Sequence, residues 1–444
     1  MLIRRYFTSG YSAEDSFLDT LMSEERFPME KSDVRIAGRD GEIKFEQFNV
    51  EFPEWWTPNS RLIVTSKYFR GDTSSPDRES SVRQIIHRVV TTIGNKGREL
   101  GYFLTDKEQD AFQDELAFIL IWQKAWFNSP VWFNVGIARE PQCAACFILK
   151  LEDNIESILG IANQEALIFK DGSGTGKNMS RLRSRYERLS GGGKASGVLS
   201  FMRVYDSMAN IIKAGGKYRR AATLEILDVD HPEIMDFIKC KAHEEEKARV
   251  LINAGYGDPM DFENEAYQTV AFQNVNISIG TTNKFMQAVE NDEEWETKFR
   301  VPELAPGSPI TYKARDLLME TAIAAHRCGD PGIFYLDNIN EWNTCINDFT
   351  IHSSNPCGEF LFVDNSACNL ASLNLLKFSD GKNFNLDDFY HTINIMIIAQ
   401  DILVDLGHYP TQEIEENSKK YRPLGLGYGN LGALLMAWGI PYDS

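Results

Sequence analysis

Residues 355–359 read Asn355-Pro356-Cys357-Gly358-Glu359, and a second cysteine, Cys368, follows eleven residues after the first. If this segment is extended, side chains two residues apart share one face, so Asn355, Cys357 and Glu359 lie side by side. Such an arrangement joins a thiol, a hydrogen-bonding amide and a carboxylate that can act as a general base. A cysteine of this kind is also often a small buried apolar residue, so the segment alone leaves both interpretations open.

The other thiols are spread widely through the 444 residues. The seven cysteines are Cys143, Cys146, Cys240, Cys328, Cys345, Cys357 and Cys368. An odd number at such spacing favours thiols over a disulfide framework. Cys143 and Cys146 have CxxC spacing, which is found in zinc sites and redox pairs, but the chain has no second CxxC, so we expect no metal.

Composition limits the classes of partner. The formal net charge is −18, which disfavours general binding to a nucleic-acid backbone, so an anionic ligand must be met by a local basic pocket. The most apolar stretches, such as 117–122, are too short to span a bilayer, and the N-terminus lacks the apolar region of a secretory signal. We therefore expect a cytoplasmic protein that does not enter a membrane.

The N-terminal part has the pattern of a helical module. Residues 1–75 are punctuated by prolines and are interpreted as an irregular lead-in. Apolar residues then recur at helical spacing from Val82 to Ile93, and Thr105-x-x-Glu108 is a capping box that opens a second helix. We predict a mainly helical domain over residues 1–135.

From about residue 147 short apolar strands alternate with glycine-rich loops and amphipathic helices, which is typical of an α/β domain. The predicted strands are 146–151, 222–227, 274–279, 332–336 and 371–375. The predicted helices include 198–213 and 388–406. A second domain is therefore expected over residues 136–444.

Two further segments could bind anions. Residues 171–178, Asp-Gly-Ser-Gly-Thr-Gly-Lys-Asn, are glycine-rich but fit neither a Walker loop nor a dinucleotide fingerprint, so a structural turn is equally compatible. Residues 213–220 hold four cations in eight residues, which could clamp phosphates or could simply be a solvated loop.

Taken together, the motifs resemble the catalytic subunit of ribonucleotide reductases. Besides Asn-x-Cys-x-Glu and Cys368, several other segments of this chain resemble family motifs and occur in the same order as in that family. They are 128–130 (Asn-Ser-Pro), 145–147 (Ala-Cys-Phe), 174–176, 180–183, 191–194, 219–220, 230–232 and 422–427. Residues 241–256, with Glu244-Glu245-Glu246-Lys247 ahead of Asn253-Ala254-Gly255-Tyr256, look most like adenosylcobalamin-dependent members. The resemblance covers nearly the whole chain. It implies that 136–444 form the first half of a ten-stranded α/β barrel with its finger loop.

The resemblance also implies a mechanism and its residues. A thiyl radical on Cys357 would abstract the 3′ hydrogen of the ribose, with Glu359 as general base and Asn355 holding the sugar. Cys146 and Cys368 would supply two electrons on becoming a disulfide. The cofactor would be adenosylcobalamin, and the product a 2′-deoxyribonucleotide.

Binding residues and partners follow from the same resemblance. The ribonucleotide substrate would also contact Ser129, Ala145, Cys146 and Gly174. A deoxynucleoside triphosphate effector would be bound by Asp153, Arg183, Asp206, Lys213 and Arg219. The helices of the effector site would form a homodimer, and a thioredoxin-like protein would reduce the disulfide.

The sequence departs from the family pattern in two places. It has no recognisable N-terminal ATP-binding cone, and the second half-barrel with its phosphate-binding loop does not lie within residues 1–444. We expect a separate C-terminal half or a longer protein, because a half-barrel leaves sheet edges open. The alternatives are a diiron-dependent large subunit and a nucleotide-binding half-subunit without catalysis.

Overall fold

The structure is a computed structural model that describes residues 3–38, 41–212, 221–258, 264–305 and 307–444. The chain divides into two compact units, which are described separately. Unit 1 comprises residues 1–145, 368–409 and 418–444, and unit 2 comprises residues 146–367 and 410–417.

Unit 1 is built mainly from helices. Its elements are α1 (Phe17–Met22), β1 (Glu30–Ala37), β2 (Ile43–Phe52), α2 (Pro58–Ile63), a π-helical turn (Val64–Tyr68), α3 (Val82–Glu99), α4 (Asp106–Ile121), β3 (Ala125–Phe127), α5 (Ser129–Asn134), most of β13 (Ser366–Asn374), a 3-10 turn (Leu375–Phe378), α13 (Leu386–Leu406), the end of α14 (Gln412–Tyr421), β14 (Leu424–Gly429) and α15 (Leu431–Trp438). β13 pairs with β14 in parallel and with β3 in antiparallel fashion.

The predicted helices of unit 1 are confirmed, and their apolar faces form its core. Val82, Ile86, Val89 and Ile93 of α3 are fully buried among α4 and α13. The side chain of Thr105 caps α4, although Glu108 reaches the amide of Leu104 rather than that of Thr105, so the capping box is only half formed.

One expectation for unit 1 was wrong. Residues 1–75 are not an irregular lead-in, because β1 and β2 pair as an antiparallel hairpin. Most side chains of these two strands are not fully buried, so their sequences lack the apolar–polar alternation that marks a half-buried sheet.

Among the described residues, one helix, α13, is long and apolar enough to cross a membrane. Its Ile395, Met396 and Leu403 lie in the core of unit 1, and buried core helices pass the same test.

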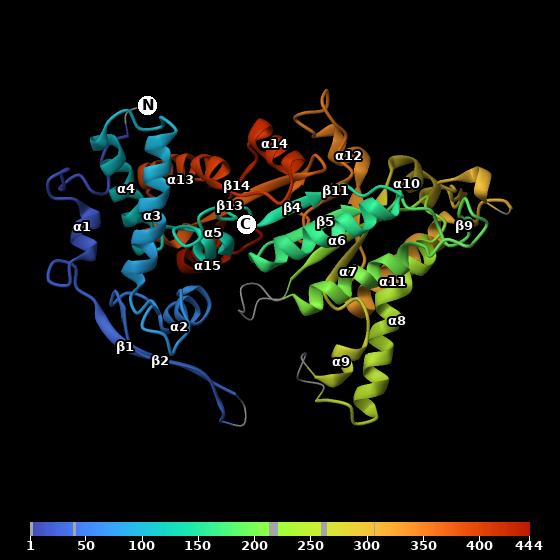
Figure 1. The fold of residues 1–444 in the computed structure, drawn as a ribbon, viewed down its shortest axis with the longest axis horizontal. Helices are drawn as coiled ribbons and strands as arrows, with labels where there is room; N and C mark the ends of the chain where they lie inside the picture. The colour runs from blue at the N-terminus through green and yellow to red at the C-terminus, as the bar shows by residue number, and fades with distance from the viewer. Residues whose placement is uncertain (1–2, 39–40, 213–220, 259–263, 306) are drawn as a thin grey trace. The chain divides into compact units, whose positions relative to one another are not determined.

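Unit 2 is an α/β unit around a parallel sheet. Its elements are β4 (Cys146–Leu149), α6 (Ile155–Lys170), β5 (Gly174–Asn178), α7 (Val198–Ile211), β6 (Thr223–Asp228), α8 (Ile234–Asn253), α9 (Glu265–Thr269), β7 (Val275–Thr281), α10 (Asn283–Glu290), β8 (Glu294–Glu296), a 3-10 turn (Pro302–Leu304), β9 (Thr311–Lys313), α11 (Ala314–Cys328), β10 (Gly332–Tyr335), α12 (Leu336–Glu341), β11 (Ser353–Ser354) and β12 (Leu361–Phe362). Five parallel strands lie in the order β10-β7-β6-β5-β4, and Figure 1 shows the neighbouring strands β4 and β5 of this sheet. This confirms the predicted α/β class. The predicted strand 371–375 instead belongs to β13 in unit 1, and β5 takes the remaining place in this sheet.

The glycine-rich segment 171–178 supplies a strand that the sequence did not predict. Gly174 pairs with Cys146 of β4, and Thr175 pairs with Thr223 of β6, so β5 lies inside the sheet. Glycine disfavours strands, and an anion-binding loop or a turn was therefore the expectation. The tertiary structure overrides that preference, because side-chain-free positions on β5 make room for another segment of unit 2.

Candidate active site

The motif 355–359 forms a tight turn rather than an extended segment. The amide of Gly358 donates to the carbonyl of Asn355 at 3.2 Å, and Gly358 has a φ of 86°. Proline at the second position and glycine at the fourth are common in such turns, and only glycine adopts this φ without strain. The extended arrangement predicted from spacing is therefore wrong, and the turn presents Cys357 as an exposed residue.

The turn brings Asn355 and Glu359 to one partner, Cys146. The Asn355 amide donates to the Cys146 sulfur at 3.0 Å, and the Cys146 thiol donates to the Glu359 carboxylate at 3.4 Å. Asn355 is fully buried, and its side-chain oxygen accepts the amide hydrogen of Phe360 at 2.9 Å. A thiol, an amide and a carboxylate thus converge beside Cys357.

Two glycines of β5, Gly174 and Gly176, lie against this turn. A Cβ atom on Gly174 would lie 2.6 Å from Cγ of Pro356 and 2.9 Å from the carbonyl oxygen of Ala222. A Cβ atom on Gly176 would overlap the carbonyl of Ser354. The finger, residues 349–362, therefore lies against the glycine face of β5, and neither position has room for a side chain.

The opposite face of β5 carries a buried ionic cluster. Lys177 contacts Glu165 of α6 at 2.8 Å and Glu225 of β6 at 3.2 Å, and all three side chains are fully buried. Burial alone would lower the pKa of Lys177, but the two carboxylates outweigh it and raise that pKa. Burial, together with repulsion from Glu165, raises the pKa of Glu225 to about 7 although Lys177 opposes the shift.

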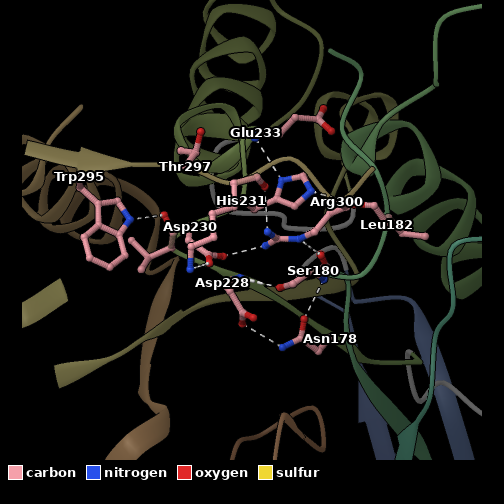
Figure 2. Close-up of polar contacts among 12 residues, drawn as sticks. Asn178, Ser180, Leu182, Asp228, Asp230, His231, Glu233, Trp295, Thr297 and Arg300 are labelled. Atoms are coloured by element: carbon pink, nitrogen blue, oxygen red, sulfur yellow. Dashed lines mark hydrogen bonds and ion pairs between the residues drawn. The ribbon is translucent and has the colours of Figure 1, made fainter. Parts of the chain in front are cut away.

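A second polar network lies where β5 and β6 end (Figure 2). The Asn178 amide donates to the carboxylate of Asp228 at 3.0 Å and to the carbonyl of His352 at 2.9 Å, so it ties the finger to the sheet. Burial raises the pKa of Asp228, against the effect of the hydrogen bond from Asn178. Beside it, Arg300 pairs with Asp230 at 2.7 Å.

His231 in this network is neutral. Burial, aided by the positive charge of Arg300, lowers the pKa of His231 to about 3. Its Nε2 lies 2.9 Å from the carbonyl oxygen of Leu182, and its Nδ1 accepts the amide hydrogen of Glu233 at 3.1 Å. Because a carbonyl can only accept, Nε2 carries the proton. His231 is therefore a structural link rather than a proton donor.

The predicted substrate residues fall in both units. Cys146, Gly174, Asn355, Cys357 and Glu359 lie together in unit 2. Ser129, Ala145 and Cys368 belong to unit 1. There the hydroxyl of Ser129 is 3.0 Å from that of Tyr68, and Ala145 donates its amide hydrogen to the carbonyl of Cys368 at 3.0 Å.

The three predicted effector residues that the structure describes make their contacts in two separate places. Arg183 and Asp153 form an ion pair at 2.6 Å. Asp206 is instead buried on α7, where its carboxylate accepts the amide hydrogens of Phe272 and Asn274 at 2.6 and 2.9 Å. Lys213 and Arg219 lie outside the described residues.

Sequence reasoning missed Asn178 and Asn276, two side chains that hold the finger. Asn276 donates to the carbonyl of Pro356 at 2.7 Å. The available signal was a polar residue at alternate positions of an otherwise apolar strand, in Val275-Asn276-Ile277-Ser278-Ile279. That pattern marks the face on which Asn276 lies, but it does not say what covers the face.

Comparison with known proteins gives the family. A family model described as "Ribonucleotide reductase, barrel domain" matches residues 144–444, and one described as "Class II vitamin B12-dependent ribonucleotide reductase" matches residues 30–123.

Several relatives are similar over most of this chain. The vitamin B12-dependent ribonucleotide reductase of Rhodopirellula baltica is 45% identical over 440 residues, covering 92% of this chain and 42% of the relative. That of Streptomyces avermitilis is 48% identical over 417 residues, covering 93% and 43%. The vitamin B12-dependent ribonucleoside-diphosphate reductase of Mycobacterium tuberculosis is 34% identical over 319 residues, covering 71% and 41%. The chain thus spans less than half the length of these relatives, and it belongs to the class II, vitamin B12-dependent ribonucleotide reductase family, not to the diiron-dependent alternative.

Proposed function

We propose that this chain carries the radical thiol of a reductase that converts ribonucleotides to 2′-deoxyribonucleotides for DNA synthesis. The observation that supports it most directly is the convergence of the Asn355 amide and the Glu359 carboxylate on the Cys146 thiol, beside exposed Cys357. Binding a nucleotide would require neither a carboxylate bonded to a thiol nor a cysteine at the tip of a tight turn.

In the proposed reaction, a thiyl radical on Cys357 takes the 3′ hydrogen atom of the ribose. Glu359 accepts the proton of the 3′-hydroxyl, and the Asn355 amide orients the sugar. The 2′-hydroxyl then leaves as water after taking up a proton. Cys357 finally returns a hydrogen atom to the 3′ carbon.

The two electrons for this step come from a dithiol. Cys146 and Cys368 would lose two hydrogens and form a disulfide, so that one ribonucleotide and one dithiol yield one deoxyribonucleotide, one water and one disulfide. The 3.4 Å contact between the Cys146 thiol and Glu359 supports a proton path from this thiol to the general base. A thioredoxin-like dithiol protein would reduce the disulfide.

Residues beside the finger fit part of adenosylcobalamin. A cavity of about 470 Å³ is lined mainly by aromatic and aliphatic side chains, with two amides and a threonine hydroxyl among them: Ile333, Phe334, Tyr335, Asn338, Ile339, Trp342, Asn343, Thr344, Ile351, Leu361 and Phe362. A Cβ atom on Gly358 would lie 3.3 Å from the Phe334 ring, so this wall reaches the Cys357 turn. Flat apolar surface with a few polar groups suits an adenosyl group or a corrin face. When bound, the cofactor supplies radical chemistry.

We further propose an effector site and a homodimer on the helices of unit 2. The Asp153–Arg183 pair and Asp206, together with Lys213 and Arg219, which lie outside the described residues, would receive a deoxynucleoside triphosphate. Exposed apolar side chains on α6 and α7 support a partner surface: Ile155, Leu159, Leu167, Val204 and Ile211. An isologous contact between these helices would bury them.

Three proposals concern the protein as a whole. A second half-barrel, in the same or a separate polypeptide, would complete the site, in keeping with relatives more than twice as long. Residues 1–135 would form the helical domain and 136–444 the half-barrel domain. The reductase would act in the cytoplasm.

The proposal is tested with the complete reductase, adenosylcobalamin, a dithiol and each ribonucleotide, measuring deoxyribonucleotide by chromatography. We expect Cys357→Ser to abolish turnover, and Cys146→Ser and Cys368→Ser to abolish turnover with the dithiol. Cys345→Ser is the matched control, because Cys345 lies outside the motif, and it should retain activity. Turnover that persists in Cys357→Ser, or turnover without cobalamin, would contradict the proposal; nucleotide binding without turnover would favour a non-catalytic half-subunit.

A further inference from the structure

Four asparagine side chains hold the backbone of the finger. Each donates an amide hydrogen to a carbonyl of the segment that leads to Cys357. The bonds run from Asn343 to Phe349 at 2.8 Å, from Asn340 to Ile351 at 2.9 Å, from Asn178 to His352 at 2.9 Å and from Asn276 to Pro356 at 2.7 Å.

Of these four bonds, the one from Asn276 reaches the peptide group of Cys357 itself. The Pro356 carbonyl belongs to the planar peptide unit that includes the amide nitrogen and Cα of Cys357, so fixing that oxygen restrains the plane from which the cysteine side chain projects. The ring of Pro356 also packs against β5, since a Cβ atom on Gly174 would lie 2.6 Å from Cγ of Pro356. Pro356 is thus held by contact with β5 and by a hydrogen bond from β7.

Asn276 is attached to a firmly held strand. β7 lies between β6 and β10 in the sheet, and its neighbours Val275 and Ile277 are buried. The Asn276 side chain itself is largely exposed, so shortening it opens no cavity in the core. A loss of this amide would therefore act mainly on Pro356.

We propose that Asn276 is a positioning residue that fixes the orientation of the Cys357 sulfur for hydrogen abstraction. The inference rests on the proposed function, because it concerns the geometry of that reaction. Reacting atoms must approach closely and in line, and a displacement of about 1 Å can cost about 100-fold in rate. The charge-neutral amide holds the carbonyl without adding a second acid or base to the site of Glu359.

The first test compares Asn276→Ala with Asn178→Ala in the complete reductase. Each variant removes one asparagine-to-carbonyl hydrogen bond to the finger, but Asn178 acts at His352, five residues from Cys357. We expect Asn276→Ala to lower kcat about 10- to 100-fold with KM changed less than about twofold, because the substrate contacts remain. Asn178 also donates to the Asp228 carboxylate, so Asn178→Ala should destabilise the protein at least as much, yet it should reduce kcat far less.

The second test uses the isosteric variant Asn276→Asp and its pH profile. An ionised aspartate repels the Pro356 carbonyl, whereas a protonated one can donate an O–H to it as the amide did. The kcat of Asn276→Asp relative to wild type should therefore rise about fivefold or more between about pH 8 and about pH 5.5, where a carboxyl facing a carbonyl begins to take up its proton. Relative to wild type, Asn276→Ala should show no such rise, since it has no donor at any pH.

The outcomes separate the two levels of inference. If Asn276→Ala has a kcat within twofold of wild type, or if Asn276→Asp and Asn276→Ala keep a constant ratio across the pH range, Asn276 does not position Cys357. Those results leave the proposed function standing as long as Cys357→Ser is inactive. An active Cys357→Ser would instead remove the reaction that Asn276 is proposed to serve.

Discussion

A Cβ atom on Gly176 would overlap the carbonyl oxygen of Ser354, because the finger lies directly against β5 at this point. Gly176→Ala should therefore displace the finger, lowering kcat of the complete reductase about 100-fold and stability by about 1–3 kcal/mol. Steady-state kinetics and urea unfolding measure the two effects. Gly160→Ala on α6 is the control, since nothing lies within 4 Å of its added Cβ, and it should be neutral or stabilising. Wild-type turnover in Gly176→Ala would show that the finger is not held here.

The ionic cluster behind β5 predicts a pH-dependent stability. The pKa of Glu225 is raised to about 7 in the folded protein from 4.5, chiefly by burial. A raised carboxyl pKa means that the folded state binds the proton of Glu225 more tightly than the unfolded chain does. The stability that this protonation contributes is complete below about pH 4.5 and is lost as the pH rises through about 7. Glu225→Gln should therefore flatten the urea-unfolding profile between these pH values. A profile with the wild-type slope would contradict the assignment.

Removing the cation of the same cluster should be costly. Lys177→Met leaves Glu165 and Glu225 buried without their shared partner, so we expect a loss of about 3–5 kcal/mol, larger above about pH 7 where Glu225 is charged. Lys239→Met is the control: it breaks a half-exposed pair with Glu320 at 3.2 Å and should cost under about 1 kcal/mol. Equal losses in the two variants, measured by urea unfolding, would mean that burial does not set the cost.

Asp206 should stabilise the loop before β7. Its carboxylate accepts the amide hydrogens of Phe272 and Asn274, and Phe272 has a φ of 65°, which a non-glycine residue rarely adopts. Asp206→Ala should therefore cost about 2–4 kcal/mol, because it leaves two amide donors without the acceptor that holds this unfavourable backbone conformation in place. Hydrogen exchange of residues 271–276 should accelerate, and Ser207→Ala should leave it unchanged. Altered effector binding with unchanged exchange would instead favour direct contact between Asp206 and the effector.

Arg422 should stabilise the start of β14 through its forked geometry. It contacts Asp401 at 2.7 Å and Asp405 at 2.8 Å, and it donates to the Tyr102 hydroxyl at 3.1 Å. Lysine cannot reproduce this fork, so Arg422→Lys should lower the stability by about 1–2 kcal/mol, visible as a lower Tm. Arg35→Lys, which affects an exposed pair at 3.5 Å, should leave the Tm nearly unchanged. A similar Tm shift in both variants would argue against a special role for Arg422.

Much of the fold could be predicted where one physical signal dominates. The helical stripe of α3 and the apolar strands β4, β6, β7 and β10 follow from periodicity and from runs of apolar residues. β5 escaped prediction because glycines and a lysine have poor strand propensity. Its glycines are needed for the close approach of the finger, and its lysine is tolerated only because two carboxylates from other elements meet it.

The candidate site was predicted in part. The identity of Asn355, Cys357 and Glu359 was evident from their spacing and family order, but their geometry was not. An extended segment would align the three side chains directly, whereas the observed turn aligns two of them on Cys146 of β4. Spacing along the chain cannot specify a contact with a residue some 200 positions away.

The sequence by itself therefore determined the chemical groups of this protein, their order and the α/β class, because these depend on residue types and local periodicity. Only the tertiary structure decided that the motif is a turn, that the glycine-rich segment is a strand, and that Asn276 reaches the carbonyl before Cys357. Each of these depends on the close packing of segments distant in the chain. The free energy that stabilises these arrangements comes from contacts and burial between distant segments, and no single stretch of sequence contains both partners.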